Sequence, residues 1–213
     1  FLILTISLGV VFAENTTDEN TNNDIQTFDD LQSQINSVSE NDTLKISGTY
    51  RSLGEDITIN KTLTIEGSPG ATLDADEYSG IFTVTHFNNL TLKNLKFING
   101  NGDAQGGAIY SRASLILINC TFINNHANPV ESTNPYGEQF NMSTGGAISC
   151  LNSVQAINCK FINNTANTCG AIYYEGSLTC TGCEFSYNKV NNALGIIYTN
   201  LNSKCVLNNC SIS

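Results

Sequence analysis

The sequence predicts an all-β fold, namely a right-handed parallel β-helix with a short amphipathic capping helix at its N-terminal end. Three observations lead to this prediction. A phrase of the form Asn-Cys-x-Phe-Ile-Asn-Asn recurs along the chain, apolar and polar residues alternate inside each copy, and Asn or Gly separates the alternating segments. The copies follow one another at about 25 residues, which is shorter than the roughly 33 to 47 residues of paired-helix repeats. The repeat is therefore built from strands.

The residue two positions before each Phe or Ile marks the copies: Leu95, Cys120, Cys159, Cys183 and Cys210. Successive steps are 25, 39, 24 and 27 residues. The step of 39 residues contains one period and an insertion, and we expect residues 126–144 to leave the solenoid. The coils within 43–76 are less regular. Leu63 and Ile65 lie 27 residues before Leu90 and Leu92, so we expect these two pairs to stack in neighbouring coils.

Each copy contains two segments in which apolar residues recur at every second position, which is the pattern of a strand with one buried side. Between the two segments the step widens to three, and the extra positions are Asn94, Asn119, Asn158, Gly182 and Asn209. Asn and Gly tolerate a left-handed backbone, so we expect a bend there, and a second bend at Gly106-Gly107 and Gly145-Gly146. Coils stacked about 4.8 Å apart then align a ladder of Phe97, Phe122, Phe161 and Phe185 beside a ladder of cysteines.

The phrases Gly106-Gly107-Ala108-Ile109-Tyr110 and Asn119-Cys120-Thr121-Phe122-Ile123-Asn124-Asn125 resemble the repeats of adhesin-like surface proteins of methanogenic archaea. They are also similar to the GGAI and FxxN repeats of chlamydial polymorphic outer-membrane proteins. The resemblance extends over roughly residues 43–213. It implies an exported β-helix stalk or adhesive surface, and it specifies no ligand.

The N-terminal residues divide into three parts. Residues 1–13 are mostly apolar and end in Val11-Phe12-Ala13, which is typical of a truncated signal peptide; a buried strand or an uncleaved anchor is the alternative. Residues 14–26 have little apolar content until Ile25, which favours a disordered lead-in. Residues 27–213 are the predicted β-helix with its N-terminal cap, and we expect the chain to stop in mid-coil at Ser213.

The capping helix is predicted from residues 27–38. Phe28, Leu31, Ile35 and Val38 fall on one helical face. Thr27 and Asp30 resemble a capping box, with Asp in place of Glu. Such a helix covers the open edge of the first coil, which otherwise recruits other chains.

The net charge of −10 and the pI near 4.4 exclude a typical nucleic-acid-binding protein. Ten of the carboxylates lie within residues 14–56, whereas five carboxylates and six bases follow Leu90, so the regular repeats are close to neutral. Four of the eight cysteines occupy the inward ladder, and we expect most cysteines to be buried thiols rather than disulfides. For Cys180 and Cys183, core packing is favoured over a redox or zinc CxxC motif.

An enzyme is the rival interpretation, because β-helices also carry polysaccharide-cleaving activities. Hydrolysis needs paired carboxylates, and elimination needs calcium-binding carboxylates with an Arg or Lys base. The candidate groups do not cluster in this way: Asp29 and Asp30 fall in the cap, Arg51 and Arg112 are the two arginines, and His86 and His126 stand alone. For the acidic group Asp74, Asp76 and Glu77, a solvated turn is favoured over a calcium site. We therefore predict no catalytic, cofactor-binding or metal-ligating residue.

The sequence thus leads us to expect a non-enzymatic, adhesin-like protein that is secreted or attached to the cell surface or cell envelope. Its expected partners are surface glycans or molecules on host or partner cells, bound through the faces and loops of the β-helix. We expect no cofactor and no nucleic acid, and envelope attachment through a region that follows Ser213. The alternative is the N-terminal fragment of a β-helix polysaccharide lyase or glycoside hydrolase.

Overall fold

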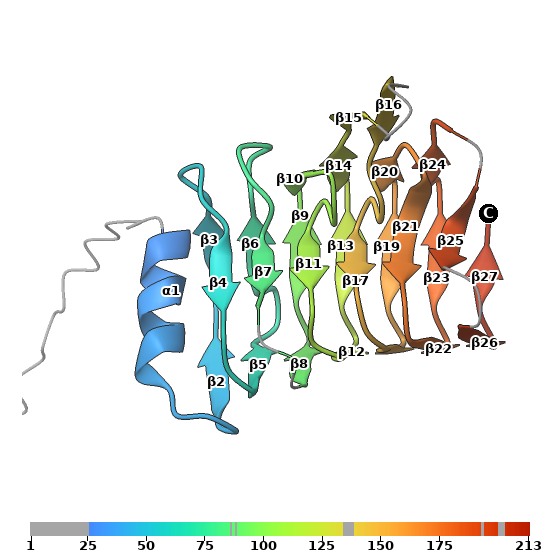
Figure 1. The fold of residues 1–213 in the computed structure, drawn as a ribbon. Coiled ribbons are helices and arrows are strands. Elements are labelled where there is room, and N and C mark those ends of the chain that lie inside the picture. Colours follow the sequence, from blue (N-terminus) through green and yellow to red (C-terminus); the bar gives the residue numbers. More distant parts are fainter. Residues whose placement is uncertain (1–25, 86, 88, 134–138, 193, 200–202) are drawn as a thin grey trace, which may run out of the picture.

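The structure is a computed structural model that describes residues 26–85, 87, 89–133, 139–192, 194–199 and 203–213. These residues form a right-handed parallel β-helix of about seven coils, with helix α1 (Phe28–Ser37) across its N-terminal end (Figure 1). The predicted fold class is confirmed.

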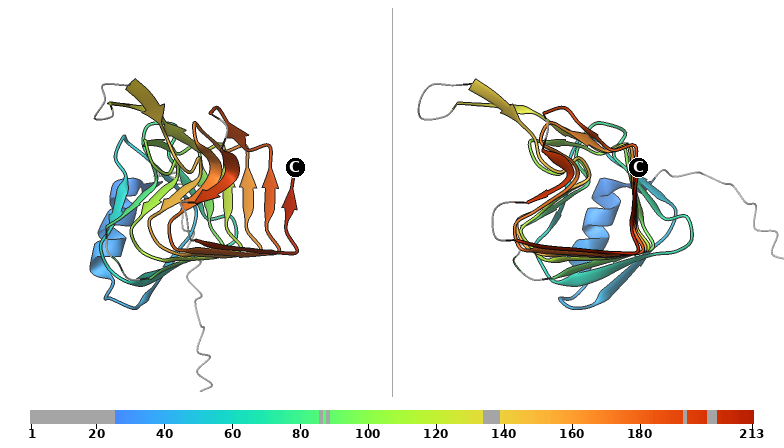
Figure 2. Two further views of the ribbon diagram at one scale, coloured as in Figure 1. Left: turned by 45° about the vertical axis from the view of Figure 1, so that its right-hand side comes forward. Right: turned by 90° about the vertical axis from the view of Figure 1, so that its right-hand side faces the viewer.

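Three long parallel sheets form the walls of the solenoid, which Figure 2 shows end-on. Sheet A contains β1 (Gln26–Thr27), β3 (Thr49–Arg51), β6 (Thr72–Asp74), β9 (Lys96–Ile98), β13 (Thr121–Ile123), β19 (Lys160–Ile162), β23 (Glu184–Ser186) and β27 (Ser211–Ile212). Sheet B contains β2 (Thr43–Ile46), β5 (Leu63–Gly67), β8 (Leu90–Lys93), β12 (Leu115–Ile118), β18 (Val154–Ile157), β22 (Ser177–Thr181) and β26 (Lys204–Asn208). Sheet C contains β4 (Ile57–Ile59), β7 (Phe82–Val84), β11 (Ile109–Ser111), β17 (Ile148–Cys150), β21 (Cys169–Tyr174) and β25 (Gly195–Thr199).

A fourth, shorter sheet lies between sheets A and C along each of the middle coils. Sheet D contains β10 (Asn101–Asp103), β14 (His126–Asn128), β20 (Thr165–Ala166) and β24 (Lys189–Val190). Apart from an irregularity between β21 and β25, the register pairs equivalent residues of successive coils. Leu63 and Ile65 pair with Leu90 and Leu92, which confirms the predicted stacking.

Helix α1 begins at Phe28 because Thr27 and Asp30 form a reciprocal capping box. The Asp30 carboxylate accepts the Thr27 N–H at 2.7 Å, and the Thr27 hydroxyl accepts the Asp30 N–H at 3.2 Å. At the other end, the Lys61 ammonium donates to the carbonyl of Ile35 at 2.9 Å, where a cation favours the helix dipole. The helix covers the first coil with its buried residues Phe28, Leu31 and Ile35, as predicted.

The phenylalanine ladder forms the centre of the core. Ring centroids of Phe97, Phe122, Phe161 and Phe185 are 4.7, 5.0 and 4.8 Å apart in succession, and the rings are nearly parallel. The in-register strand pairing imposes this spacing, because each ring lies one strand separation from the next. Phe82 of sheet C closes the ladder edge-on against Phe97 at 5.6 Å.

The predicted bends are confirmed by their backbone angles. The five positions between sheets B and A all have positive φ, from 50° to 64°. A second column with positive φ, which the sequence analysis did not identify, ends the strands of sheet A at Asn99, Asn124, Asn163 and Tyr187. Asn and Gly adopt the left-handed conformation at low cost, and so the regular coils turn at these two columns. The predicted bend at Gly106 and Gly145 also has positive φ, of 67° at both residues.

A ladder of buried asparagines follows the second column of bends. Asn164 donates from Nδ2 to the Phe122 carbonyl at 3.1 Å and to the Asn188 side-chain oxygen at 2.9 Å. Its own side-chain oxygen accepts from the backbone N–H and the Nδ2 of Asn125, at 3.1 and 2.9 Å. Buried amides must be paired, and this ladder satisfies them between coils. Repetition of Asn124-Asn125 and Asn163-Asn164 was the sequence signal for it.

The insertion is smaller than predicted. Residues His126–Asn128 do not leave the solenoid, since they form β14 and pair with Asn101–Asp103. The segment after Asn128 forms an antiparallel hairpin of β15 (Val130–Thr133) and β16 (Gln139–Met142) that projects from the body (Figure 2). The chain rejoins the coil at Thr144, which bridges to Gln105.

The predicted signal peptide, residues 1–13, and most of the predicted lead-in, residues 14–25, lie outside the described residues. Gln26 was assigned to the disordered lead-in, and this was wrong, because β1 pairs with β3 through Gln26 and Tyr50. Among the described helices, none has the length and apolar character that a membrane span requires.

Candidate functional site

The residues weighed as catalytic candidates are dispersed. Asp29 and Asp30 lie in α1, His126 lies in β14, and Arg112 is an exposed residue after β11. His86 lies outside the described residues. Cys180 and Cys183 are buried in the core, as expected for packing residues. All eight cysteines are free thiols, and six of them are buried.

The acidic group Asp74, Asp76 and Glu77 is not the plain solvated turn that we expected. Asp74 is buried, with 5% of its surface exposed. The Arg51 guanidinium binds Asp76 through Nη1, at 2.8 and 2.6 Å from the two carboxylate oxygens, and lies 3.4 Å from Asp74. An arginine of the preceding coil therefore pairs with two of the three carboxylates, Asp74 and Asp76. Among the described residues, no set of three or more His, Cys, Asp or Glu side chains is arranged to hold a metal ion.

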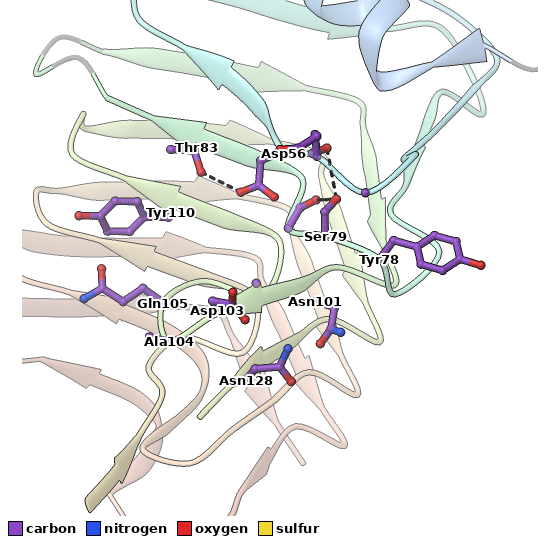
Figure 3. Close-up of a pocket in the computed structure, with 14 residues that line it drawn as sticks. Asp56, Tyr78, Ser79, Thr83, Asn101, Asp103, Ala104, Gln105, Tyr110 and Asn128 are labelled. Atoms are coloured by element: carbon purple, nitrogen blue, oxygen red, sulfur yellow. Dashed lines mark hydrogen bonds between the residues drawn. The ribbon is translucent and has the colours of Figure 1, made fainter. Parts of the chain in front are cut away.

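The structure instead brings together residues that the sequence analysis did not select. They line a cleft of about 610 Å³ beside sheets C and D (Figure 3): Gly54, Glu55, Asp56, Tyr78, Ser79, Gly80, Thr83, Asn101, Gly102, Asp103, Ala104, Gln105, Tyr110 and Asn128. Four kinds of functional group are present, namely carboxylates, amides, hydroxyls and tyrosine rings. All lie on the first four coils.

The floor of the cleft comes from regular strands. Thr83 and Tyr110 are in-register neighbours on sheet C, and their side chains alternate with the buried residues of β7 and β11. Asp103 and Asn128 are in-register neighbours on sheet D. The angle between the two sheets depends on Gly106, which has a φ of +67° and whose added Cβ lies 2.0 Å from the Ile109 carbonyl oxygen. A side chain at this position is therefore incompatible with the turn.

One wall of the cleft comes from loops of the first two coils. The buried hydroxyls of Ser52 and Ser79 join these loops through a hydrogen bond of 2.7 Å. Asp56 accepts a hydrogen bond of 2.8 Å from the Thr83 hydroxyl, which directs its carboxylate over sheet C (Figure 3). The carboxylate lies against Gly80, since an added Cβ there comes within 2.9 Å of Asp56 Oδ2. Gly80 thus leaves the space that Asp56 occupies.

The charge of the cleft is negative. Its lining contains the carboxylates of Glu55, Asp56 and Asp103 and no Lys, Arg or His. Among the described residues, the ion pairs lie elsewhere, at Arg51 and at Lys160 with Glu184. The three carboxylates are exposed to solvent, so the cleft presents hydrogen-bond acceptors and a local negative potential.

Comparison with known proteins agrees with the fold. No family model matches the chain, and no curated protein matches it. A solved structure described as a new PL6 alginate lyase in complex with a trisaccharide is similar, with a TM-score of 0.53 and 17% sequence identity. The similarity covers 77% of this chain and 35% of the lyase, so the chain spans about a third of the lyase's length. What the two proteins share is a β-helix.

At 17% identity this likeness shows the shared fold alone, and it favours neither the adhesin-like interpretation nor the polysaccharide-cleaving one. The prediction that the chain is not an enzyme therefore has no support. The archaeal and chlamydial resemblances, export, envelope attachment and cell-surface partners all stay predictions.

Proposed function

We propose that the chain is a secreted or surface-attached β-helix that binds polysaccharide in the cleft between sheets C and D. The supporting observation is the lining, in which Tyr110 lies among amides and carboxylates while Tyr78 stands at the rim. Tyrosine rings pack against the apolar faces of sugars, and amides and carboxylates bind their hydroxyls. Because the cleft rests on stacked strands, it needs little rearrangement to bind a ligand.

The charge of the cleft favours a neutral or amino-bearing polymer over a polymer of uronic acids. A uronate carboxylate placed beside Asp56 or Asp103 is repelled, and the lining offers it no cation. A sugar hydroxyl or ammonium group donates to the same carboxylates. The ligand of this cleft therefore differs in charge from the polymer named for the similar lyase.

The test is calorimetric titration of the protein with three hexasaccharides, made of glucose, glucosamine or uronic acid. We expect binding of the first two and none of the third. Tyr110→Ala and Asp56→Asn should weaken binding, and Gly80→Ala should weaken it by displacing the Asp56 carboxylate. Glu40→Gln is the matched control, because Glu40 is an exposed carboxylate on the turn between α1 and β2. Tight binding of the uronate alone, or equal affinities in all variants, contradicts the proposal.

Cleavage of the bound polymer is the second candidate. It rests on the presence of Asp56 and Asp103 in one cleft. Hydrolysis needs one carboxyl group as acid and one carboxylate as base or nucleophile. Incubation with the hexasaccharides, followed by assay of new reducing ends, tests it. Hydrolysis must be lost in both Asp56→Asn and Asp103→Asn, whereas binding without product leaves the chain as a binding protein.

A further inference from the structure

The turn that carries Tyr78 contains two strained backbone positions. Asp76 and Glu77 are consecutive non-glycine residues in the left-handed region, with φ of 50° and 63°. Each residue of this kind costs about 1 kcal/mol or more. Such a conformation persists only where its surroundings enforce it, and it often marks a functional position.

Contacts from both neighbouring coils hold this turn in place. On one side, Arg51 binds the Asp76 carboxylate through Nη1 at 2.8 and 2.6 Å. On the other side, Asn101 Nδ2 donates to the Glu77 carbonyl at 2.9 Å, and the Asn101 N–H donates to the Ser79 carbonyl at 2.6 Å. The turn is therefore fixed from the first coil and from the third.

This fixed turn holds the aromatic ring of Tyr78 exposed to solvent. Tyr78 is 71% exposed, although it lies between the anchored residues of the turn. In Figure 3 its side chain extends from the rim of the cleft, away from the other labelled side chains. An exposed tyrosine on a mobile loop loses side-chain and backbone freedom when it binds a ligand, whereas a tyrosine on a fixed turn has lost most of it already.

We propose that the turn at residues 75–79 is a stacking subsite at the rim of the cleft, in which Tyr78 packs on the apolar face of a sugar ring. Arg51 is its positioning residue, because it holds the left-handed turn without reaching the ligand. This inference rests on the proposed function, and it adds a sugar-binding position outside the part of the cleft that holds Asp56 and Tyr110. The subsite is selective for polymers long enough to extend past the rim.

The first test compares a disaccharide and a hexasaccharide of the glucosamine or glucose series, whichever the wild-type protein binds. Tyr78→Ala should weaken hexasaccharide binding about fivefold or more, as for the loss of one aromatic contact, and leave disaccharide binding unchanged. Tyr78→Phe keeps the aromatic ring, so it should bind the hexasaccharide as the wild-type protein does. Tyr187→Ala is the control, since Tyr187 is also exposed, at 74%, and also belongs to a turn with a left-handed residue, its own φ being 57°, but it follows β23, away from the cleft.

The second test separates positioning from folding. Arg51→Met should weaken hexasaccharide binding and accelerate amide hydrogen exchange at residues 76–79 in the absence of ligand. Glu77→Gly relieves the backbone strain, so it should raise the unfolding midpoint while it weakens hexasaccharide binding. Unchanged exchange in Arg51→Met, or full affinity in both Tyr78→Ala and Glu77→Gly, overturns the inference and leaves the proposed function intact. Failure of the wild-type protein to bind any hexasaccharide overturns both.

Discussion

The side-chain amide of Gln32 forms two hydrogen bonds with the backbone of Thr58, as an adjacent strand would. Gln32 Nε2 donates to the Thr58 carbonyl at 3.0 Å, and Gln32 Oε1 accepts from the Thr58 N–H at 2.7 Å. Thr58 lies in β4, the first strand of sheet C. Helix α1 thereby covers the core of the first coil and also occupies part of its free edge.

Replacement of Gln32 should therefore have two effects. Gln32→Leu leaves two backbone groups of Thr58 to water, and we expect the free energy of unfolding in urea to fall by about 1 kcal/mol. The exposed strand edge should also promote association, detectable as a concentration-dependent shift in size-exclusion chromatography. Ser33→Ala, on the exposed side of α1, should change neither quantity. A monomeric Gln32→Leu protein of wild-type stability contradicts this account.

Removal of one member of the asparagine ladder should be costly. Asn164 is fully buried, and its side chain takes part in four hydrogen bonds that join three coils. Asn164→Leu leaves the Phe122 carbonyl and the Asn125 amide groups without these partners, and we expect a loss of about 3 kcal/mol or more. Asn60→Ala, at an exposed position after β4, is the control. Denaturant unfolding of both variants provides the comparison.

The phenylalanine ladder should behave as one packed unit. Phe122→Ala opens a cavity between the stacked rings of Phe97 and Phe161, so we expect a loss of about 3–5 kcal/mol. Phe87→Ala should change stability by less than about 0.5 kcal/mol, because Phe87 is 72% exposed. Thermal and urea unfolding measure the loss of stability in each variant. Equal losses in the two variants contradict the central position of the ladder.

The prediction of the solenoid succeeded because its determinants are periodic. The Phe positions, the bend residues and the Gly-Gly pairs recur from coil to coil, and each recurrence carries the same structural role. The buried ladder at Asn125 and Asn164 was just as visible in the repeated Asn-Asn, but its hydrogen bonds join different coils and become evident only when the coils are stacked.

The sequence contains no comparable periodic pattern that predicts the cleft. Asp56, Tyr78 and Gln105 lie in connections between strands, outside the repeated phrases, and they are far apart in the sequence. The turns that follow β3, β6 and β10 bring them to one side of the solenoid. Their proximity depends on the lengths of these connections, which no local pattern specifies.

Thiol reactivity should report on the core. Burial raises the pKa of Cys150 to about 11 and that of Cys169 to about 12, so both remain protonated and inert at neutral pH. Cys205 is exposed and should react with a maleimide within minutes, while Cys150 and Cys169 should react only in denaturant. Peptide mass spectrometry identifies the labelled sites, and Cys205→Ser should abolish the fast phase assigned to it.

The capping helix should loosen in acid. Hydrogen bonds from the backbone and hydroxyl of Thr27 lower the pKa of Asp30 below 3.8. A carboxylate whose pKa is lower in the folded state stabilises the fold above its unfolded pKa, and this contribution disappears as the pH falls through the folded value. Amide exchange of α1, corrected for its intrinsic pH dependence, should thus accelerate below about pH 4. In Asp30→Asn this acid-dependent step should be absent.

The hairpin of β15 and β16 lengthens the chain without disturbing the stacking of the coils. The chain leaves the solenoid after Asn128, rejoins it at Thr144, and the strands on either side keep the register of the coils above and below. Extra length at this point adds no rise along the axis and displaces no ladder. Insertions at this point can therefore change the surface beside the cleft without changing the residues that the core requires.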